Sequence, residues 1–249
     1  MEAVDYLIVG AGTAGCVVAE RLSASGKNQV MLLEAGGTDR RFWIRVPIGY
    51  GRTFNDPAVN WMYEAEPEPA LGDVRSFWPR GKVLGGSGSI NAMVYARGQP
   101  GDFDDWRALG NPGWGWSDVR PHFEAIEHRS GGPLSITDVS AAAHPLCQAY
   151  IAAAATLGFS YTPDFNGTQP EGVGIYQITT RNGFRASTAT AFLRPALGRR
   201  NLQLALHSHA MRVDLEGRRA VGVTYRRADQ THTVRARKAV ILAAGSVNS

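Results

Sequence analysis

The fold is decided by the stretch VDYLIVGAGTAG, residues 4–15, in which a short apolar run leads directly into three glycines. An apolar run of this length that ends at a glycine is typical of a buried parallel strand. Residues 16–25 continue with a helical pattern, and Gly26 closes it in the position of a left-handed cap. A second apolar run, residues 30–33, ends on Glu34. This order predicts a β-α-β unit of about 30 residues.

The glycines of this unit suit a turn that binds phosphate. Gly10 permits the tight turn, Gly12 lets the backbone approach a pyrophosphate, and Gly15 allows close packing of helix on strand. The helix that starts there directs its amides and its dipole at an anion. Glu34 follows 19 residues after Gly15, where it can accept hydrogen bonds from a ribose diol and would repel a 2′-phosphate. The pattern predicts dinucleotide binding, against the alternative of glycines used for packing alone, and it leaves NAD and FAD both open.

A second glycine cluster, RGKVLGGSGSINAMV at residues 80–94, bears on the choice of cofactor. A basic pair, Arg80 and Lys82, precedes a flexible loop that carries hydroxyl groups and is expected to open a helix. Such a loop could wrap an extended cofactor at a distance from the first phosphate site. The alternative is a plain glycine-rich turn, which the length and density of the cluster disfavour.

The middle of the chain is irregular and rich in Trp, Gly and Pro, with two helices predicted. The first begins with Ser117 as its N-cap and runs to about Glu127. The second is an alanine-rich helix over residues 144–157, which Gly158 stops.

The last third of the chain changes to strand patterns. Residues 174–179 predict a strand that leads to a turn at 182–183, and residues 187–197 predict a short helix. Four segments of alternating polarity then predict a three- or four-stranded antiparallel meander, at residues 202–206, 209–215, 220–226 and 231–236. The apolar run 239–244 enters Gly245 and is expected inside the parallel sheet, beside the first strand.

Composition excludes several classes of protein. The 249 residues carry a net charge of +4, and no window approaches the ~20 apolar residues of a membrane span. The acidic start is no signal peptide, so we expect a cytoplasmic protein. From Arg181 onward 13 Lys/Arg face three Asp/Glu, but they have no interleaved aromatic platform, which favours a solvated face over a nucleic-acid surface. Cys16 and Cys147 lack CxxC spacing and are expected as free thiols rather than a disulfide.

The segment 81–91 resembles the first signature of the glucose–methanol–choline (GMC) oxidoreductases, and further motifs follow in the same order. These matches are Asp5–Gly15, Glu34–Gly37, Trp61–Tyr63, Asn111–Trp114, Gly132–Leu134, Asp164–Gly167, Asn182–Ser187 and Ala243–Ser249, the last similar to the opening of the second family signature. The resemblance covers essentially the whole chain and is nearest to the choline-dehydrogenase-like or alcohol-dehydrogenase-like branch. It implies a flavoprotein that passes hydride from a primary alcohol to flavin N5 and releases an aldehyde. An NAD-linked dehydrogenase is disfavoured by the 80–91 loop.

The resemblance also implies which residues contact FAD. Those of the pyrophosphate turn and the adenosine site are Gly10, Gly12, Thr13, Ala14, Gly15, Glu34, Ala35 and Ala210. Those nearer the ribityl chain and the flavin are Arg80, Val83, Gly86, Ser87, Asn91, Ala92, Met93 and Val94, and the second signature adds Ala244 and Gly245. Ala210 stands where the family usually has a valine that meets the adenine through its backbone. Ile90 stands where some members carry a histidine bonded to the flavin, so the FAD should be non-covalent.

The expected fold class is α/β, a Rossmann-like FAD-binding domain with a parallel sheet, a β-α-β start and an antiparallel meander, plus part of an α+β substrate domain. The FAD-binding domain is expected to be discontinuous, at residues 1–140 and 180–249, and incomplete at its carboxyl end. Residues 141–180 are expected to form part of the substrate or cap domain.

No catalytic residue and no metal ligand is expected in this chain. In the family the base is a histidine near the far carboxyl terminus, which the resemblance places beyond Ser249. The histidines present fit no base or metal pattern: His122, His128, His144, His207, His209 and His232. We therefore expect a truncated FAD-binding portion, with a complementary carboxyl-terminal chain or a homo-oligomer as partner. The alternative is a non-catalytic dinucleotide-binding module or one chain of a split enzyme.

Overall fold

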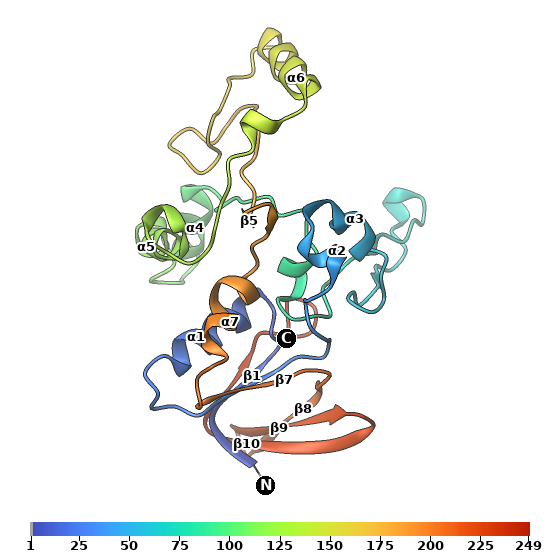
Figure 1. Ribbon diagram of the computed structural model, residues 1–249, viewed down its shortest axis with the longest axis vertical. Helices are drawn as coiled ribbons and strands as arrows, with labels where there is room; N and C mark the ends of the chain where they lie inside the picture. The colour runs from blue at the N-terminus through green and yellow to red at the C-terminus, as the bar shows by residue number, and fades with distance from the viewer. Residues whose placement is uncertain (1) are drawn as a thin grey trace. The chain divides into compact units, whose positions relative to one another are not determined.

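The computed structural model describes residues 2–249 and divides the chain into two compact units (Figure 1). Unit 1 comprises Met1–Ala92 and Gly183–Ser249, and unit 2 comprises Met93–Asn182. These units are defined by contacts within the chain and do not show which residues bind FAD or substrate. The expected FAD-binding domain at 1–140 with 180–249 and the expected substrate domain at 141–180 therefore stay a prediction.

Unit 1 is built on a six-stranded sheet in the order β7-β2-β1-β10-β9-β8. Its strands are β1 (Glu2–Val9), β2 (Val30–Leu33), β7 (Leu202–Ala205), β8 (His209–Glu216), β9 (Arg219–Arg227) and β10 (Gln230–Leu242). β7, β2, β1 and β10 run parallel, whereas β9 and β8 are antiparallel to their neighbours. The helix α1 (Thr13–Ser23) joins β1 to β2. The predicted β-α-β start and the α/β class are confirmed.

The meander differs from the prediction at its first strand. β7 belongs to the parallel part of the sheet, where Leu202 to Ala205 pair with Val30 to Leu33 of β2. It is the outermost strand there, and an edge strand shows the same alternation of apolar and polar residues as a meander strand. The meander therefore has three strands, β8, β9 and β10.

β10 is one continuous strand where two were predicted. Residues 230–235 pair with β9 and residues 234–242 pair with β1. Arg237 and Lys238 lie between the two predicted segments, and both have partners along the strand: Arg237 donates to Asp5, and Lys238 lies over the Tyr6 ring. The predicted position of its second half, beside the first strand, is confirmed.

Both faces of the parallel sheet are covered by apolar side chains. On one face Ile8 and Leu32 pack against Cys16 of α1 and Leu193. On the other, a core of β1 and β2 residues includes Tyr225 of β9. Burial raises the pKa of the Cys16 thiol to about 12, and neither Cys16 nor Cys147 is in a disulfide, as predicted.

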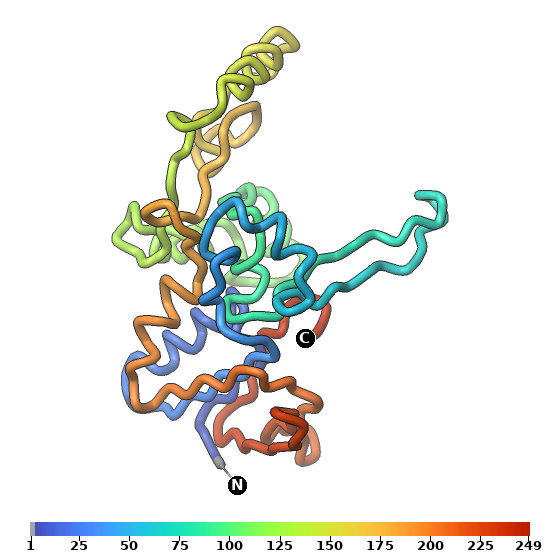
Figure 2. Tube along the Cα trace, turned by 45° about the vertical axis from the view of Figure 1, so that its right-hand side comes forward, coloured from blue at the N-terminus to red at the C-terminus, as the bar shows by residue number. Residues whose placement is uncertain are grey.

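The remaining elements of unit 1 are short. They are α2 (Phe42–Arg45), η1 (Pro47–Gly49), α3 (Tyr50–Thr53), β3 (Tyr63–Glu64), η2 (Pro69–Leu71), β4 (Phe77–Trp78), η3 (Gly86–Ser89), β6 (Phe184–Arg185), η6 (Ala189–Leu193) and α7 (Arg194–Ala196). β3 and β4 pair as the base of an arm (cyan) that reaches out from the rest of unit 1 (Figure 2). The helix expected after Gly86 is only the four-residue 3-10 turn η3, because Gly85 and Gly86 both have positive φ.

Unit 2 holds the other helices. They are α4 (Pro100–Ala108), α5 (Trp116–Ile126), η4 (His128–Ser130), η5 (Ser140–Ala142) and α6 (Pro145–Thr156), and the short strand β5 (Thr180–Arg181) follows. The helix predicted at 144–157 is confirmed. No helix within residues 2–249 has the length and apolar character needed to cross a bilayer.

Two local predictions in unit 2 are wrong. The N-cap of α5 is Gly115 rather than Ser117, because Asp118 accepts a hydrogen bond from the Gly115 amide at 3.1 Å. Residues 174–179 form no strand; Ile178 makes only isolated bridges, to Val94 and Thr137.

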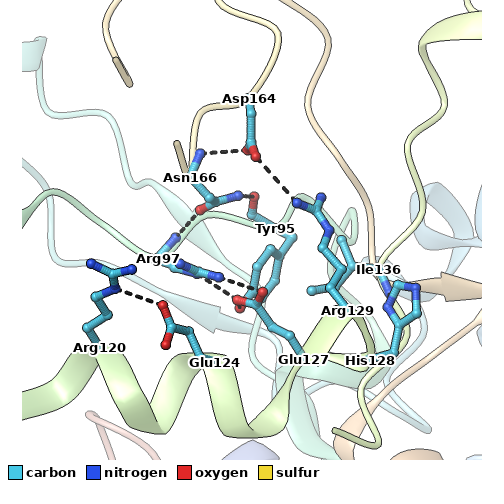
Figure 3. A network of polar contacts seen from close by, with 10 residues as sticks. All are labelled: Tyr95, Arg97, Arg120, Glu124, Glu127, His128, Arg129, Ile136, Asp164 and Asn166. Atoms are coloured by element: carbon cyan, nitrogen blue, oxygen red, sulfur yellow. Dashed lines mark hydrogen bonds and ion pairs between the residues drawn. The ribbon is translucent and has the colours of Figure 1, made fainter. Parts of the chain in front are cut away.

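A polar network ties unit 2 together around one buried carboxylate (Figure 3). The Glu127 side chain is 2% exposed and receives two hydrogen bonds from Arg97, at 2.6 and 2.5 Å, and one from the Tyr95 hydroxyl. Asn166 accepts from the Arg97 amide at 2.8 Å and donates to the Tyr95 carbonyl. Burial and the Glu127 carboxylate raise the pKa of Tyr95, so the phenol stays a donor. The network fixes three segments that are distant in sequence.

Candidate functional site

A cavity of about 790 Å³ lies in unit 1 at the carboxyl ends of β1, β2 and β10. In open α/β sheets, ligands bind at this edge. The residues that line it are Val9, Gly10, Gly12, Thr13, Ala14, Leu33, Glu34, Ala35, Trp61, Tyr63, Arg80, Gly81, Gly86, Ser87, Val223 and the runs 208–213 and 242–249.

The glycine turn between β1 and α1 forms one wall of this cavity. Gly10 has a φ of +96°, and a Cβ there would lie 2.5 Å from the Ala243 carbonyl oxygen. A Cβ on Gly15 would lie 1.9 Å from the Gly10 oxygen, so Gly15 serves packing. At Gly12 the nearest atom to a Cβ is the Gly86 Cα at 3.8 Å. Because Gly12 has no side chain, the space next to it, directly before the first residue of α1, belongs to the cavity.

Glu34 forms the acidic end of the cavity. One carboxylate oxygen accepts from the Ala11 amide at 2.9 Å, and the other accepts from the Gly36 amide at 2.8 Å. The residue is only 6% exposed, and burial raises its pKa to about 7 against the opposing effect of these two amides. Each oxygen has a second lone pair, so the carboxylate can still accept hydrogen bonds from a ligand.

The second glycine cluster faces the first. A Cβ on Gly86 would lie 2.7 Å from the Gly12 Cα, so the two loops touch backbone to backbone. The Ser87 hydroxyl accepts from the Gly81 amide at 3.0 Å, which holds the loop closed on itself. This backbone contact supports the prediction that both glycine clusters bind one ligand.

An aromatic wall on the cavity was not predicted as part of the site. Trp61 and Tyr63 stack with ring centroids 5.9 Å apart, and His209 meets Trp61 edge-on at 5.5 Å. The Lys82 Nζ lies over the Trp61 ring, 4.8 Å from its centroid. Burial lowers the pKa of His209, and Arg226 and Lys82 add to this, so a neutral imidazole is favoured beside Ala210. Two signals were available in the sequence: the match of Trp61–Tyr63 to a GMC motif and the density of aromatic residues before Arg80.

The structure brings most of the expected site residues together. The cavity is lined by Gly10, Gly12, Thr13, Ala14, Glu34, Ala35, Arg80, Gly86, Ser87, Ala210, Ala244 and Gly245. Gly15 lies beneath the turn, and Val83 is fully buried in a small core with Ile90. Asn91 and Ala92 are exposed at the end of the first segment of unit 1. Met93 and Val94 belong to unit 2, so their contact with a ligand stays a prediction.

The histidines form no catalytic or metal cluster among residues 2–249. No group of three potential ligands is close enough to hold a metal ion within that range. His128 accepts from the Ile136 amide, His144 caps α6 by accepting from the Leu146 amide, and His232 stacks on Tyr225. These contacts are structural.

Comparison with known proteins places this geometry in a family. The family model described as GMC oxidoreductase matches residues 4–249. An oxygen-dependent choline dehydrogenase of Sinorhizobium fredii (strain NBRC 101917 / NGR234) is 42% identical over 253 residues, covering 98% of this chain and 46% of that protein. An alcohol dehydrogenase (acceptor) of Pseudomonas putida is 40% identical over 257 residues, with the same two shares.

Solved structures agree. The crystal structure of pyridoxine 4-oxidase from Mesorbium loti matches with a TM-score of 0.92 at 32% identity, over 97% of this chain and 49% of that one. An FAD-dependent oxidoreductase from Chaetomium thermophilum matches with a TM-score of 0.88 at 26% identity. The chain spans about half the length of these relatives. Fold, motif order and family match agree, and the chain belongs to the GMC oxidoreductase family.

Proposed function

We propose that the cavity of unit 1 binds FAD without a covalent bond, and that this chain is the FAD-binding portion of a GMC oxidoreductase acting on CH–OH donors. The observation that carries the proposal is the shared cavity of the glycine turn and Glu34. Such a pair suits a pyrophosphate next to an adenosine ribose.

The residues present fit the cofactor. The first amides of α1 and the room left at Gly12 would hold the pyrophosphate. The Glu34 carboxylate would accept from the ribose hydroxyls, and the backbone at Ala210 would meet the adenine. Ile90 is buried and has no nucleophile, which supports non-covalent binding. The free thiols of Cys16 and Cys147 support a cytoplasmic location.

The proposed reaction is the oxidation of a primary alcohol to an aldehyde, supported by the choline and alcohol dehydrogenases among the relatives. Bound FAD would supply the acceptor for the hydride. This chain's residues bind and orient the cofactor. We propose that the proton acceptor is a histidine in sequence that corresponds to the other half of the relatives.

The visible absorption spectrum of the purified chain, with and without added FAD, tests the proposal. We expect a flavin spectrum that survives gel filtration, and yellow supernatant after acid precipitation because the flavin is not covalently bound. We expect no bleaching by choline or other primary alcohols in this chain alone.

A colourless chain that never retains FAD would contradict binding by this chain alone. It would favour one chain of a split enzyme, which a complementary chain would restore. Retention of NADH in place of FAD would overturn the choice of cofactor. Colour that stays in the acid precipitate would contradict the non-covalent bond.

A further inference from the structure

Arg185, at the end of β6, is a buried cation with an incomplete set of partners. The residue is 6% exposed. Its Nε donates to the Ile44 carbonyl at 2.9 Å, and its Nη1 donates to the Asn91 Oδ1 at 2.8 Å and to the Gly88 carbonyl at 3.3 Å. Its Nη2 is buried and has no hydrogen-bond partner among the described residues. The guanidinium thus joins α2 to the second glycine cluster.

No carboxylate in the described part of the chain pairs with this charge. The less buried Arg194 and Arg199 of the same unit pair with Asp39 and Glu20, respectively. Around Arg185 all three acceptors are neutral amide oxygens, and burial alone lowers its pKa to about 10, so it stays protonated. A buried charge without a counter-ion is costly for a protein to keep. Such a cost points to a negative group that arrives with a ligand.

The position of Arg185 relates this charge to the cofactor cavity. Gly88 directly follows Gly86 and Ser87, which line the cavity, and Asn91 lies three residues after Gly88. The Asn91 amide donates to the Ser87 carbonyl at 2.9 Å, so the segment is one tight turn. A Cβ on Gly88 would lie 2.8 Å from the Thr13 Oγ1, so this turn packs against the first residue of α1. Glu34 and Ala210 are expected at the adenosine end of the proposed FAD, whereas the family resemblance puts the segment 86–94 nearer the ribityl chain and the flavin. Through Gly88 and Asn91, Arg185 therefore contacts the part of the loop that is expected to continue toward the flavin end.

We propose that Arg185 is a positioning residue that sets the flavin's redox balance: it holds the Gly88–Asn91 turn and places an unneutralised positive charge behind it. The inference rests on the proposed function. Hydride transfer adds two electrons and one proton to the flavin, so the reduced ring gains one negative charge. A nearby cation stabilises the reduced form more than the oxidised form. A purely structural clamp would support both forms equally.

The test compares Arg185→Gln, which removes the charge, with Arg185→Lys, which keeps it but loses the planar fork. Arg199→Gln is the matched control. Arg199 also donates three hydrogen bonds, but to Glu20 and Ser23 of α1. For each purified chain, the FAD dissociation constant is measured by fluorescence titration. The midpoint potential of bound FAD is measured by dithionite reduction against a reference dye.

We expect Arg185→Gln to weaken binding of reduced FAD about tenfold more than binding of oxidised FAD. For a two-electron couple this ratio is a potential about 30 mV more negative. Arg185→Lys should weaken binding but keep a potential close to that of the unaltered chain. Arg199→Gln should leave the potential unchanged.

A second variant covers the case in which Arg185→Gln fails to fold. Asn91→Asp puts a carboxylate where Arg185 now meets an amide oxygen. We expect it to raise the melting temperature of the FAD-free chain and to make the potential more negative. Unchanged potentials in Arg185→Gln and Asn91→Asp, with FAD still bound, would overturn the inference and leave the proposed function standing. An unaltered chain that binds no FAD would instead remove the proposed function and this inference with it.

Discussion

Gly12 and Gly15 lie three residues apart in one turn, yet a methyl group should act differently at each. Gly12→Ala meets no atom closer than the Gly86 Cα at 3.8 Å, so we expect it to fold but to bind FAD at least tenfold more weakly. Gly15→Ala would place a carbon 1.9 Å from the Gly10 oxygen, so we expect loss of stability by several kcal/mol. Thermal melts and FAD titrations of both variants check this.

Gly51→Ala is the matched control for these two substitutions. Gly51 lies within α3, and a Cβ there meets nothing within 4 Å. It should leave both the melting temperature and FAD binding close to those of the unaltered chain. Equal loss of FAD binding in Gly51→Ala and Gly12→Ala would contradict the assignment of Gly12 to the pyrophosphate.

The burial of Glu34 predicts a pH dependence of the FAD-free chain. Its pKa is raised from 4.5 to about 7 on folding, so the protonated form favours the folded state. This contribution is present below about pH 4.5 and is lost as the pH rises to about 7, on the order of 3 kcal/mol in all. Urea unfolding from pH 5 to 8 should show a smaller decline in Glu34→Gln. Parallel curves for the two chains would contradict it.

The site residues that could be predicted from sequence are those that belong to a local motif, because the spacing of their neighbours along the chain identifies the motif. Gly12 and Glu34 fall in a β-α-β unit with fixed spacing, and the structure puts both on the cavity. Trp61 and His209 are far apart in sequence, and their contact depends on the folded arm and on β8. Arg185 stood in a recognised motif, but its missing counter-ion is visible only in three dimensions.

At the scale of elements, the Glu127 network predicts how unit 2 depends on one carboxylate. Glu127→Ala leaves Arg97 with an uncompensated charge, so we expect a loss of about 3–5 kcal/mol in the free energy of unfolding. Glu124→Ala removes an exposed i,i+4 pair with Arg120 and should cost under about 1 kcal/mol. Urea unfolding of both variants checks this; Figure 3 draws both pairs.

Hydrogen exchange locates the effect of the same substitution. Protection should fall in the segments that the network joins, around Tyr95, α5 and Asn166. Equal unfolding free energies for Glu127→Ala and Glu124→Ala would show that the buried pair contributes no more than the exposed one.

Helices and strands were predicted well where local sequence determines them. They were predicted less well where pairing with a strand distant in sequence determines the structure. The β-α-β start and α6 are confirmed because apolar runs, caps and glycines mark them. The alternating pattern of β7 is typical of a meander strand, and only its parallel pairing with β2 shows that it belongs to the parallel part of the sheet. At 174–179 a strand-like pattern forms isolated bridges instead of a ladder.

At the scale of the whole molecule, exposed apolar side chains predict self-association. α6 has no buried residue, and Leu146 and Tyr150 on it are each 72% exposed; on β8, Leu215 is 63% exposed. Apolar area of this kind favours association. We expect concentration-dependent oligomers in light scattering coupled to gel filtration, reduced by a Leu146→Glu, Tyr150→Glu double variant. A monodisperse monomer at all concentrations would contradict the prediction.

β10 gives the cofactor cavity a mechanical link to the meander. Its amino-terminal half pairs with β9, and its carboxyl-terminal half pairs with β1. The strand ends directly before Ala243, which lines the cavity. A force that separates the meander from the sheet must therefore pull on the strand whose last residue, Leu242, lines the cavity. We therefore expect the meander and the ligand site to unfold together under force, and we expect no hinge between them.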